Sequence, residues 1–253
     1  MRDILREIDE KLNEIEQKEG VKVLYAVESG SRAWGFASPD SDYDVRFIYV
    51  RPKEDYLRLD IPRDVIEWQL DEVLDINGWD LKKTLSQFAK GNATLFEWCG
   101  SPIVYRTTPE WERIKEVTRA YFSEKTAICH YYGTANSTLK GYLTGDTVRY
   151  KKYFYALRPL LASNWILEYH DVPPVLFTDL LNMPIPDGIR SAIDDLLELK
   201  KITTEKEENP HIPKIRDFII AETERQQTVS NLYPDDHNHD IETLNSLFFE
   251  MLN

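Results

Sequence analysis

SGSRAWGFASPDSDYDVRF, residues 29–47, is the stretch that decides the fold we expect for this chain. It follows the apolar run VKVLYAVE, which is typical of a mostly buried strand, and it contains the turn-rich segment SPDSD. Beyond that segment the side chains alternate. Val45 and Phe47 lie on one face of an expected strand, whereas Asp42 and Asp44 lie on the other. The stretch therefore predicts two strands, joined through one turn of helix and a loop, with two carboxylates on one side of the second strand.

Each half of this stretch has the residue types that bind one part of a metal–nucleotide complex. Gly30 has no Cβ to block the approach of a phosphate, and Ser31 adds a hydroxyl to the free backbone N–H groups of a helical turn. Asp42 and Asp44 would lie roughly 6.5–7 Å apart between Cα atoms, and such carboxylates can converge on two Mg²⁺ ions. Taken separately, a simple helix cap and a polar strand edge explain the same residues. The prediction of one site depends on both halves together.

Two further strands are expected after the opening stretch. Residues 64–70 and 72–79 both alternate, and a tight turn joins them. In the second strand Leu74 and Ile76 share one face, so Asp75 lies on the opposite face. This parity makes Asp75 available to a polar site on the sheet.

Helices dominate the rest of the chain. Asp80 is expected to cap the helix LKKTLSQFAKG, and strand signals fade after about residue 105. Helical patterns cover roughly residues 3–19, 109–140, 147–170, 174–182, 187–201, 213–230 and 240–252. The fold class is therefore predicted as α+β, with an α+β domain in residues 1–105 and an all-helical domain in residues 106–253.

Composition limits the class of protein. The net charge of −13 argues against a surface that binds nucleic acid everywhere, although it leaves room for a local basic groove. The two cysteines, Cys99 and Cys129, form no CxxC pair, so a zinc site or a disulfide framework is not expected. The charged N-terminal segment and the absence of a long apolar run predict a cytoplasmic protein that does not span a membrane.

The quoted stretch resembles the G-S-x-x-x-G…S-D-x-D signature of the DNA polymerase β nucleotidyltransferase superfamily. The narrower context resembles a bacterial predicted nucleotidyltransferase of the RNA-repair-associated type, through about residue 165. The segments that carry this likeness are SRAWGF, SDYDVRF, DINGWDL, EWCGSPIVY and KKYFYALRPLLA. The resemblance implies a polymerase-β-like catalytic domain, a small mixed sheet with flanking helices, followed by a helical substrate-binding domain.

The resemblance also implies roles for individual residues. Gly30 and Ser31 would contact the triphosphate of the nucleotide, and Asp42 and Asp44 would hold the metal ions. The superfamily adds a third carboxylate on a later strand, which serves as a metal ligand and activates the attacking hydroxyl. We assign this third role to Asp75.

Two rivals for the third carboxylate and two arginines stay open at this point. Glu67 lies on a strand whose direction the sequence does not fix, and Asp80 is better explained as a helix cap. Arg32 or Arg46 could neutralise phosphate charge, although Arg46 shares the carboxylate face and could instead pair with the second aspartate.

The segment LKGYLTGDTVRYKKYFYALR, residues 139–158, is locally basic and rich in aromatic residues. One interpretation is a second wall of the nucleotide site, in which Lys151 and Lys152 reach phosphates and a tyrosine stacks on a base. The other is an amphipathic helix with solvated cations. We assign Lys151 and Lys152 to nucleotide binding. The segment PDDHNHD, residues 234–240, is predicted to be a solvated turn, with Asp240 as the cap of the last helix.

The resemblance implies an enzyme that transfers a nucleoside monophosphate from an NTP, with ATP favoured, to a hydroxyl acceptor and releases pyrophosphate. The expected cofactor is Mg²⁺, as two ions, with Mn²⁺ as the alternative. An RNA end, a protein side chain and a small molecule are all open as acceptors, and the resemblance leans towards RNA. The alternative from another class is an antitoxin-like or regulatory nucleotide-binding module that acts through a protein partner, which the intact Asp-x-Asp disfavours.

Overall fold

The computed structural model divides into two compact units, and each is described by itself. The described residues are 3–38, 41–71, 73–202 and 207–253. The first unit consists of Met1–Ala33, Asp42–Phe122 and His237–Asn253, and the second consists of Trp34–Ser41 and Ser123–Asp236. The predicted functional division at residue 105 stays a prediction.

A five-stranded mixed sheet forms the centre of the first unit, in the order β3-β4-β2-β1-β5. The strands are β1 (Lys22–Glu28), β2 (Tyr43–Val50), β3 (Val65–Leu70), β4 (Leu74–Asp80) and β5 (Val104–Thr107). β2 runs parallel to β4, and the other neighbouring pairs are antiparallel. This confirms the predicted small mixed sheet. The turn predicted between β3 and β4 includes residue 72, which lies outside the described residues.

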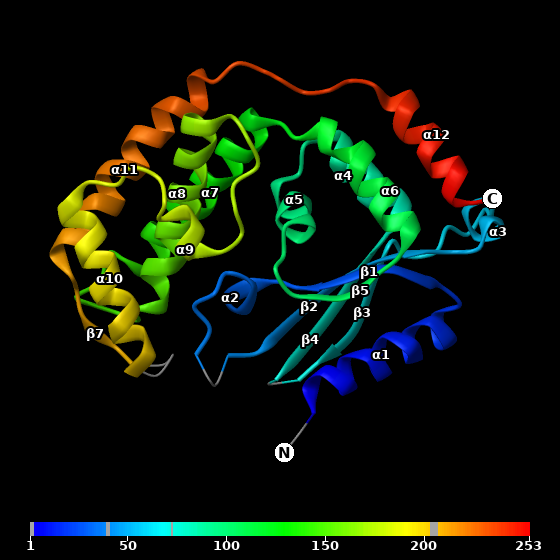
Figure 1. The fold of residues 1–253 in the computed structure, drawn as a ribbon, viewed down its shortest axis with the longest axis horizontal. Coiled ribbons are helices and arrows are strands. Elements are labelled where there is room, and N and C mark those ends of the chain that lie inside the picture. The colour runs from blue at the N-terminus through cyan, green and yellow to red at the C-terminus, as the bar shows by residue number, and fades with distance from the viewer. Residues whose placement is uncertain (1–2, 39–40, 72, 203–206) are drawn as a thin grey trace. The chain divides into compact units, whose positions relative to one another are not determined.

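One face of the sheet carries the core that the alternation predicts. Helix α1 (Ile4–Glu19) begins at the N-cap Asp3 and ends at Gly20, which has a left-handed φ of 62°. Its apolar stripe packs on this face of the sheet (Figure 1). The core residues are Ile8, Leu12, Ile15, Val21, Val23, Ala26, Val45, Phe47, Tyr49, Ile66, Leu74 and Ile76. Burial of each large side chain contributes about 1.5–3 kcal/mol, which fixes the register of the strands.

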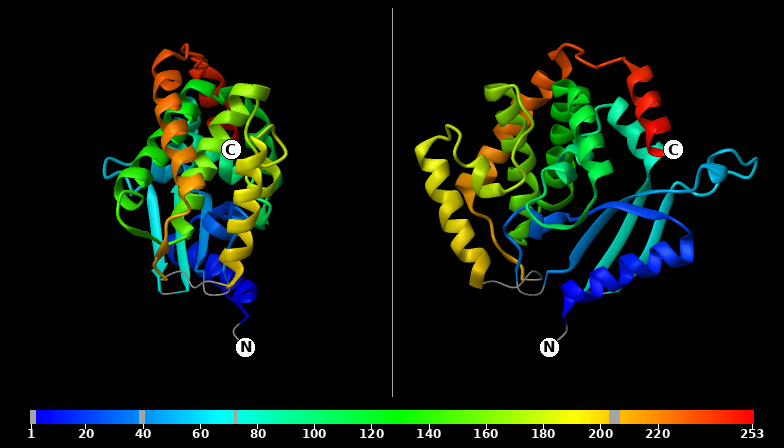
Figure 2. Two further views of the ribbon diagram at one scale, coloured as in Figure 1. Left: turned by 90° about the vertical axis from the view of Figure 1, so that its left-hand side faces the viewer. Right: turned by 45° about the vertical axis from the view of Figure 1, so that its right-hand side comes forward.

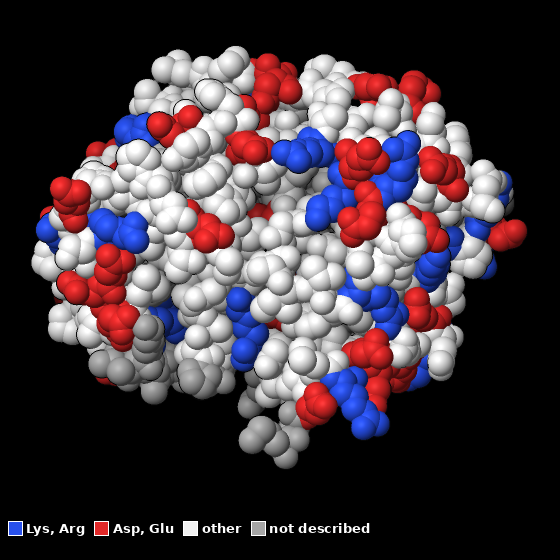
Figure 3. All heavy atoms as spheres, in the orientation of Figure 1, with Lys and Arg blue, Asp and Glu red and all other residues white. Residues whose placement is uncertain are grey.

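Other helices cover the face of the sheet opposite to α1, as the right-hand view of Figure 2 shows. They are α4 (Leu81–Ala89), α5 (Ala93–Cys99) and α6 (Pro109–Thr118), and α12 (Ile241–Met251) packs on α4 and α6. Tyr25 of β1 stacks on Trp111 of α6 at 4.5 Å between ring centroids, and Trp79 of β4 contacts Trp98 of α5 at 4.7 Å. On this helix-bearing part of the surface, acidic and basic side chains are interspersed (Figure 3).

The second unit is built mainly of helices. They are α7 (Glu124–Tyr142), α8 (Lys151–Tyr169), α9 (Phe177–Leu180), α10 (Asp187–Ile202) and α11 (Pro213–Leu232). The segment that links the two halves of the predicted motif also belongs here. Its Phe36 packs against Phe154 and Phe177 at 4.8 and 5.8 Å between centroids. Among the described residues, none of the helices is long and apolar enough to cross a membrane.

Two predicted helices differ from the structure, and two short elements were not predicted. The helix expected over residues 109–140 is interrupted, because α6 ends at Thr118 and Ser123 begins α7 as a new N-cap. The helix expected from residue 147 begins at Lys151, since residues 147–148 pair as β6 (Thr147–Val148) with β7 (Asn209–Pro210). The short helix α3 (Lys53–Tyr56) and β5 have no periodic pattern that would have predicted them.

Candidate functional site

The ends of β1 and β2 bring the two halves of the motif together. The Ser29 N–H donates to the backbone carbonyl of Asp44 at 2.8 Å. Gly30 follows with a positive φ of 63°, and a Cβ added to it would lie 2.1 Å from Oδ2 of Asp44. A glycine is therefore required here twice, for its backbone conformation and for the space that the carboxylate occupies.

Asp75 lies beside Asp44, on the adjacent parallel strand. The two residues are register partners of β2 and β4, and both side chains bond to one guanidinium. Arg46 Nη2 donates to Asp44 Oδ1 at 3.0 Å and to Asp75 Oδ2 at 2.8 Å. The predicted parity of Asp75 is confirmed, and of the two alternatives left open for Arg46 the structure shows the ion pair with Asp44.

The environment of Asp44 opposes its ionisation. Burial raises the pKa of the Asp44 carboxyl, the guanidinium of Arg46 lowers this pKa, and the nearby carboxylates of Asp42 and Asp75 raise it further. A cation placed among these carboxylates would relieve that repulsion. The electrostatics therefore suit a site for positive charge.

Asp42, Ser31 and Arg32 lie next to this pair. Asp42 is exposed just before β2, and its backbone carbonyl accepts from Arg32 Nε at 2.9 Å. The Arg32 guanidinium also stacks on the Tyr43 ring at 3.7 Å from its centroid. Ser31 and Arg32 are half-buried in α2 (Gly30–Ala33), which starts directly after β1. Their roles in phosphate binding stay predictions.

The structure separates Asp75 from its two rivals. Asp80 ends β4 at the opposite end of the strand and caps α4, where its Oδ1 accepts from the Lys82 N–H at 2.8 Å. The cap prediction for Asp80 is therefore confirmed. Glu67 pairs in register with Asn77 rather than with Asp75, and its carboxylate forms an ion pair with Arg63 at 3.3 Å. Of the three candidates for the third carboxylate, Asp75 is the one that lies directly opposite Asp44 in the register of the sheet.

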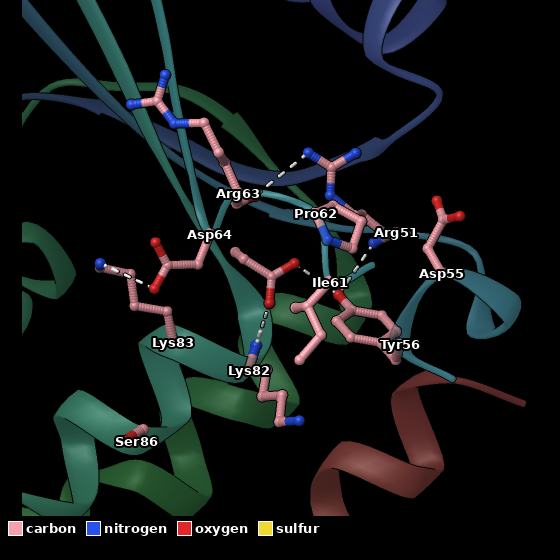
Figure 4. A pocket seen from close by; sticks show the side chains of 11 residues that line it. Arg51, Asp55, Tyr56, Ile61, Pro62, Arg63, Asp64, Lys82, Lys83 and Ser86 are labelled. Atoms are coloured by element: carbon pink, nitrogen blue, oxygen red, sulfur yellow. Dashed lines mark hydrogen bonds and ion pairs between the residues drawn. The ribbon is translucent and has the colours of Figure 1, made fainter. Parts of the chain in front are cut away.

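Asp80 is one of the residues that line a cavity of about 290 Å³. Figure 4 labels the other lining residues, including Tyr56, Lys82 and Lys83. Its lining includes the apolar side chains of Tyr56 and Ile61 and several cations. One of these cations, Lys83, already pairs with Asp64 at 3.1 Å. Because this cavity lies at the far end of β4 from Asp75, it is not part of the predicted site.

Glu28 is a site-supporting residue that the sequence-based reasoning missed. It is fully buried at the end of β1, and its Oε1 accepts the backbone N–H of Asp44 at 2.8 Å. Its Oε2 accepts the hydroxyl of Tyr105. Burial raises the pKa of the Glu28 carboxyl, and the two hydrogen bonds oppose that shift. The available signal was a glutamate that ends an otherwise apolar strand directly before the Ser-Gly pair.

Lys151 and Lys152 belong to the second unit, as the first two residues of α8. Lys152 Nζ lies 3.6 Å from the centroid of the Tyr142 ring, and both lysines line a cavity of about 520 Å³ together with Arg149. The pocket thus combines cations with an aromatic ring. Its role in nucleotide binding stays a prediction.

The segment 234–240 has structural partners for its carboxylates. Asp236 accepts from the Ser123 hydroxyl and the Glu124 N–H, both at 2.7 Å, and so supports the start of α7. Asp240 caps α12 through the Thr243 N–H at 3.1 Å, as predicted. These bonds account for Asp236 and Asp240. Asp235, Asp236 and His237 also offer ligand atoms that lie within 4.8 Å of one another, so the solvated turn expected here stays a prediction.

Comparisons with known proteins bear on the family of this chain. Residues 4–250 match the profile of RlaP, the RNA repair pathway DNA polymerase beta family. The chain is 46% identical over 222 residues to Bacillus subtilis (strain 168) YcgL, described as an uncharacterized protein, which covers 87% of this chain and 85% of that protein. A solved nucleotidyltransferase-like protein from Exiguobacterium sibiricum 255-15 has 12% identity and a TM-score of 0.30, over 96% of this chain and 79% of that one.

The structural similarity is too low to carry weight, but the family match spans nearly the whole chain. It confirms the resemblance that the Gly-Ser and Asp-x-Asp segments indicated. The adjacency of Gly30, Asp44 and Asp75 is in keeping with that resemblance. The chain belongs to the RNA repair pathway DNA polymerase beta family.

Proposed function

We propose that this protein is a metal-dependent nucleotidyltransferase that transfers a nucleoside monophosphate from an NTP to a hydroxyl acceptor and releases pyrophosphate. Family membership supports a nucleotidyltransferase role and a nucleotide substrate. The observation that carries the proposal is the convergence of Gly30, Asp44 and Asp75 near the start of the interior strands β2 and β4. ATP is the proposed donor and an RNA end the proposed acceptor.

The donor set fits a divalent cation. Two carboxylate oxygens, from Asp44 and Asp75, already bind one positively charged nitrogen between them. Hard oxygen ligands of this kind are those that Mg²⁺ prefers, and polymerase-beta-like nucleotidyltransferases generally use divalent metals. We assign Asp42, Asp44 and Asp75 to hold two Mg²⁺ ions, or Mn²⁺. When bound, these ions would neutralise phosphate charge and activate the acceptor hydroxyl.

The residues of the chain supply the remaining functions. Ser31 and the N–H groups beside it bind the triphosphate, and Arg32 neutralises part of its charge. We also assign Lys151 and Lys152 to nucleotide binding, through the pocket that they line in the second unit. Asp75 takes the proton of the acceptor hydroxyl. The oxygen of that hydroxyl attacks the α-phosphorus, and the bond between the α-phosphorus and pyrophosphate breaks. Positioning and charge neutralisation provide most of the rate enhancement.

The test is incubation with each NTP labelled at the α-phosphate, with Mg²⁺ and a panel of RNA, protein and small-molecule acceptors. We expect label on one class of acceptor and an equal amount of pyrophosphate. The double variant Asp42→Asn/Asp44→Asn serves as the control, and it should transfer no label while it keeps its circular dichroism spectrum. Thermal unfolding with Mg-NTP is the second measurement, since a ligand at 100 times its Kd stabilises by about 2.7 kcal/mol.

A protein that acts only through a partner would give a different result. It would transfer no label to any acceptor, and Mg-NTP would not raise its unfolding temperature. A double variant that binds Mg-NTP as tightly as the wild type would show that the carboxylates are wrongly assigned.

A further inference from the structure

Arg46 occupies the space between the two carboxylates of the proposed metal site. Its Nη2 binds Oδ1 of Asp44 at 3.0 Å and Oδ2 of Asp75 at 2.8 Å. Its Nη1 donates to the backbone carbonyls of Val45 at 3.1 Å and Asp75 at 3.3 Å. One guanidinium therefore holds two neighbouring strands and both acidic side chains.

This arrangement provides the positive charge that the carboxylates require without a metal. Charge-assisted hydrogen bonds of this length are among the stronger ones in proteins, and a guanidinium does not lose its proton at any physiological pH. Arg46 can therefore release the carboxylates only by moving its side chain. The Arg46 side chain can move towards solvent, because it is 19% exposed and the side chains of Asp44 and Asp75 are 25% and 26% exposed.

Arg46 and a divalent cation compete for the same oxygens. A metal ion shared by Asp44 and Asp75 needs lone pairs on the two oxygens that Nη2 now binds. Both cations would also lie too close together in a half-buried site, where their repulsion is screened less than in water. Binding of the metal therefore requires the guanidinium to leave.

We propose that Arg46 is an exchangeable counter-cation: it neutralises Asp44 and Asp75 in the metal-free protein, and it transfers to the phosphates of the nucleotide when metal binds. The inference rests on the proposed function, which supplies the metal and the triphosphate. The planar guanidinium suits both positions, since it binds carboxylates and phosphates through the same pairs of N–H groups.

The exchange couples metal binding to nucleotide binding. Metal alone must displace Arg46 into solvent, whereas metal with a triphosphate gives the guanidinium a new anionic partner. Each ligand therefore tightens the binding of the other by the same factor. A permanently fixed ion pair would give no such coupling through Arg46.

The test measures Mn²⁺ affinity of the full chain from the electron paramagnetic resonance signal of free Mn²⁺, with and without a non-hydrolysable α,β-methylene NTP. Without nucleotide, Arg46→Gln is expected to bind Mn²⁺ about 10-fold more tightly than the wild type, within the usual range of coupling. The nucleotide should then strengthen Mn²⁺ binding less in this variant than in the wild type. Arg46→Lys should lie between the two, because it keeps the charge but loses the planar fork.

Arg32→Gln is the matched control. It removes the same charge near the site, but Arg32 bonds to the Asp42 backbone carbonyl at 2.9 Å and stacks on Tyr43. Its Mn²⁺ affinity without nucleotide should rise by much less than that of Arg46→Gln. Circular dichroism verifies the fold of each variant, and Arg46→Lys provides the test if Arg46→Gln does not fold.

Two results would overturn the inference in distinguishable ways. If Asp44→Asn abolishes Mn²⁺ binding but Arg46→Gln and Arg46→Lys both bind Mn²⁺ as the wild type does, Arg46 is a fixed structural residue and the metal site stands. If Asp44→Asn and Asp75→Asn bind Mn²⁺ as tightly as the wild type, the metal site itself is wrong and the role of Arg46 fails with it.

Discussion

The parallel strands β2 and β4 carry a carboxylate with an elevated pKa near each end, and the two carboxylates differ in their partners. Near the start of the strands, burial raises the pKa of Asp44, whose Oδ1 bonds to the Arg46 guanidinium at 3.0 Å. At the end of β4, burial raises the pKa of Asp80, whose oxygens accept from the Tyr56 hydroxyl at 2.7 Å and the Lys82 N–H at 2.8 Å.

Burial and a perturbed pKa therefore do not by themselves identify a functional carboxylate. Asp80 is 4% exposed and both of its oxygens have uncharged donors that belong to fixed parts of the fold. Asp44 has a second carboxylate beside it, a guanidinium that bonds to both carboxylates, and a glycine that leaves room for its Oδ2. The partners and the adjacent space distinguish the proposed ligand site at Asp44 from the helix cap at Asp80.

The same chemical change at both ends gives the largest expected contrast. Asp44→Asn should lower nucleotidyl transfer about 1,000-fold, because it removes one of the ligands that stabilise charge in the transition state. Asp80→Asn should stay within about threefold of the wild type, since asparagine caps helices as well as aspartate does. Steady-state kinetics with Mg-NTP would measure both variants. Equal losses in the two would mean that the ends of the strands do not differ in function.

The role of Gly30 can be separated from the ordinary cost of its backbone conformation. Gly20 has a φ of 62° and open space around an added Cβ, whereas Gly30 has a φ of 63° and Asp44 at 2.1 Å. Gly20→Ala should therefore cost about 1 kcal/mol in the free energy of unfolding. Gly30→Ala should cost about 2–3 kcal/mol, because the added methyl group must also displace the carboxylate.

Urea unfolding measures this pair of variants, and Mn²⁺ affinity provides a second measurement. Gly30→Ala should weaken Mn²⁺ binding, while Gly20→Ala should leave it unchanged. Similar costs and similar affinities in both variants would show that the carboxylate moves away from residue 30 without penalty.

The local parts of this comparison could be predicted from the sequence. Alternation in β2 and β4 placed Asp44 and Asp75 on the face away from the apolar core, because side chains in a strand change sides at each residue. The cap at Asp80 followed from its position before an apolar helical pattern. The family resemblance supplied the roles that parity alone does not give.

The non-local parts could not be predicted in the same way. The pairing of β2 with β4, which places Asp44 opposite Asp75, depends on packing between strands that are not consecutive in the chain. The bridging position of Arg46 follows only from that pairing. Glu28 was missed for two reasons. A single glutamate at a strand end has no periodic signal, and its contact with the Asp44 N–H is made across strands.

The smallest expected effect is the part of the pH dependence of stability that comes from Asp80, at the cap end of β4. The pKa of Asp80 is raised above the ordinary aspartate value of 3.8. At pH values just above 3.8 the Asp80 carboxyl is therefore protonated in a larger fraction of folded molecules than of unfolded ones. Stability from this group is therefore present at low pH and is lost as the pH rises through the raised pKa. Asp80→Asn should remove this contribution, and its unfolding free energy in urea should fall less between pH 4 and 7 than that of the wild type, by up to about 1 kcal/mol. Parallel pH profiles would mean that Asp80 is ionised equally in the folded and unfolded protein, and the similarity between the two carboxylates would then disappear.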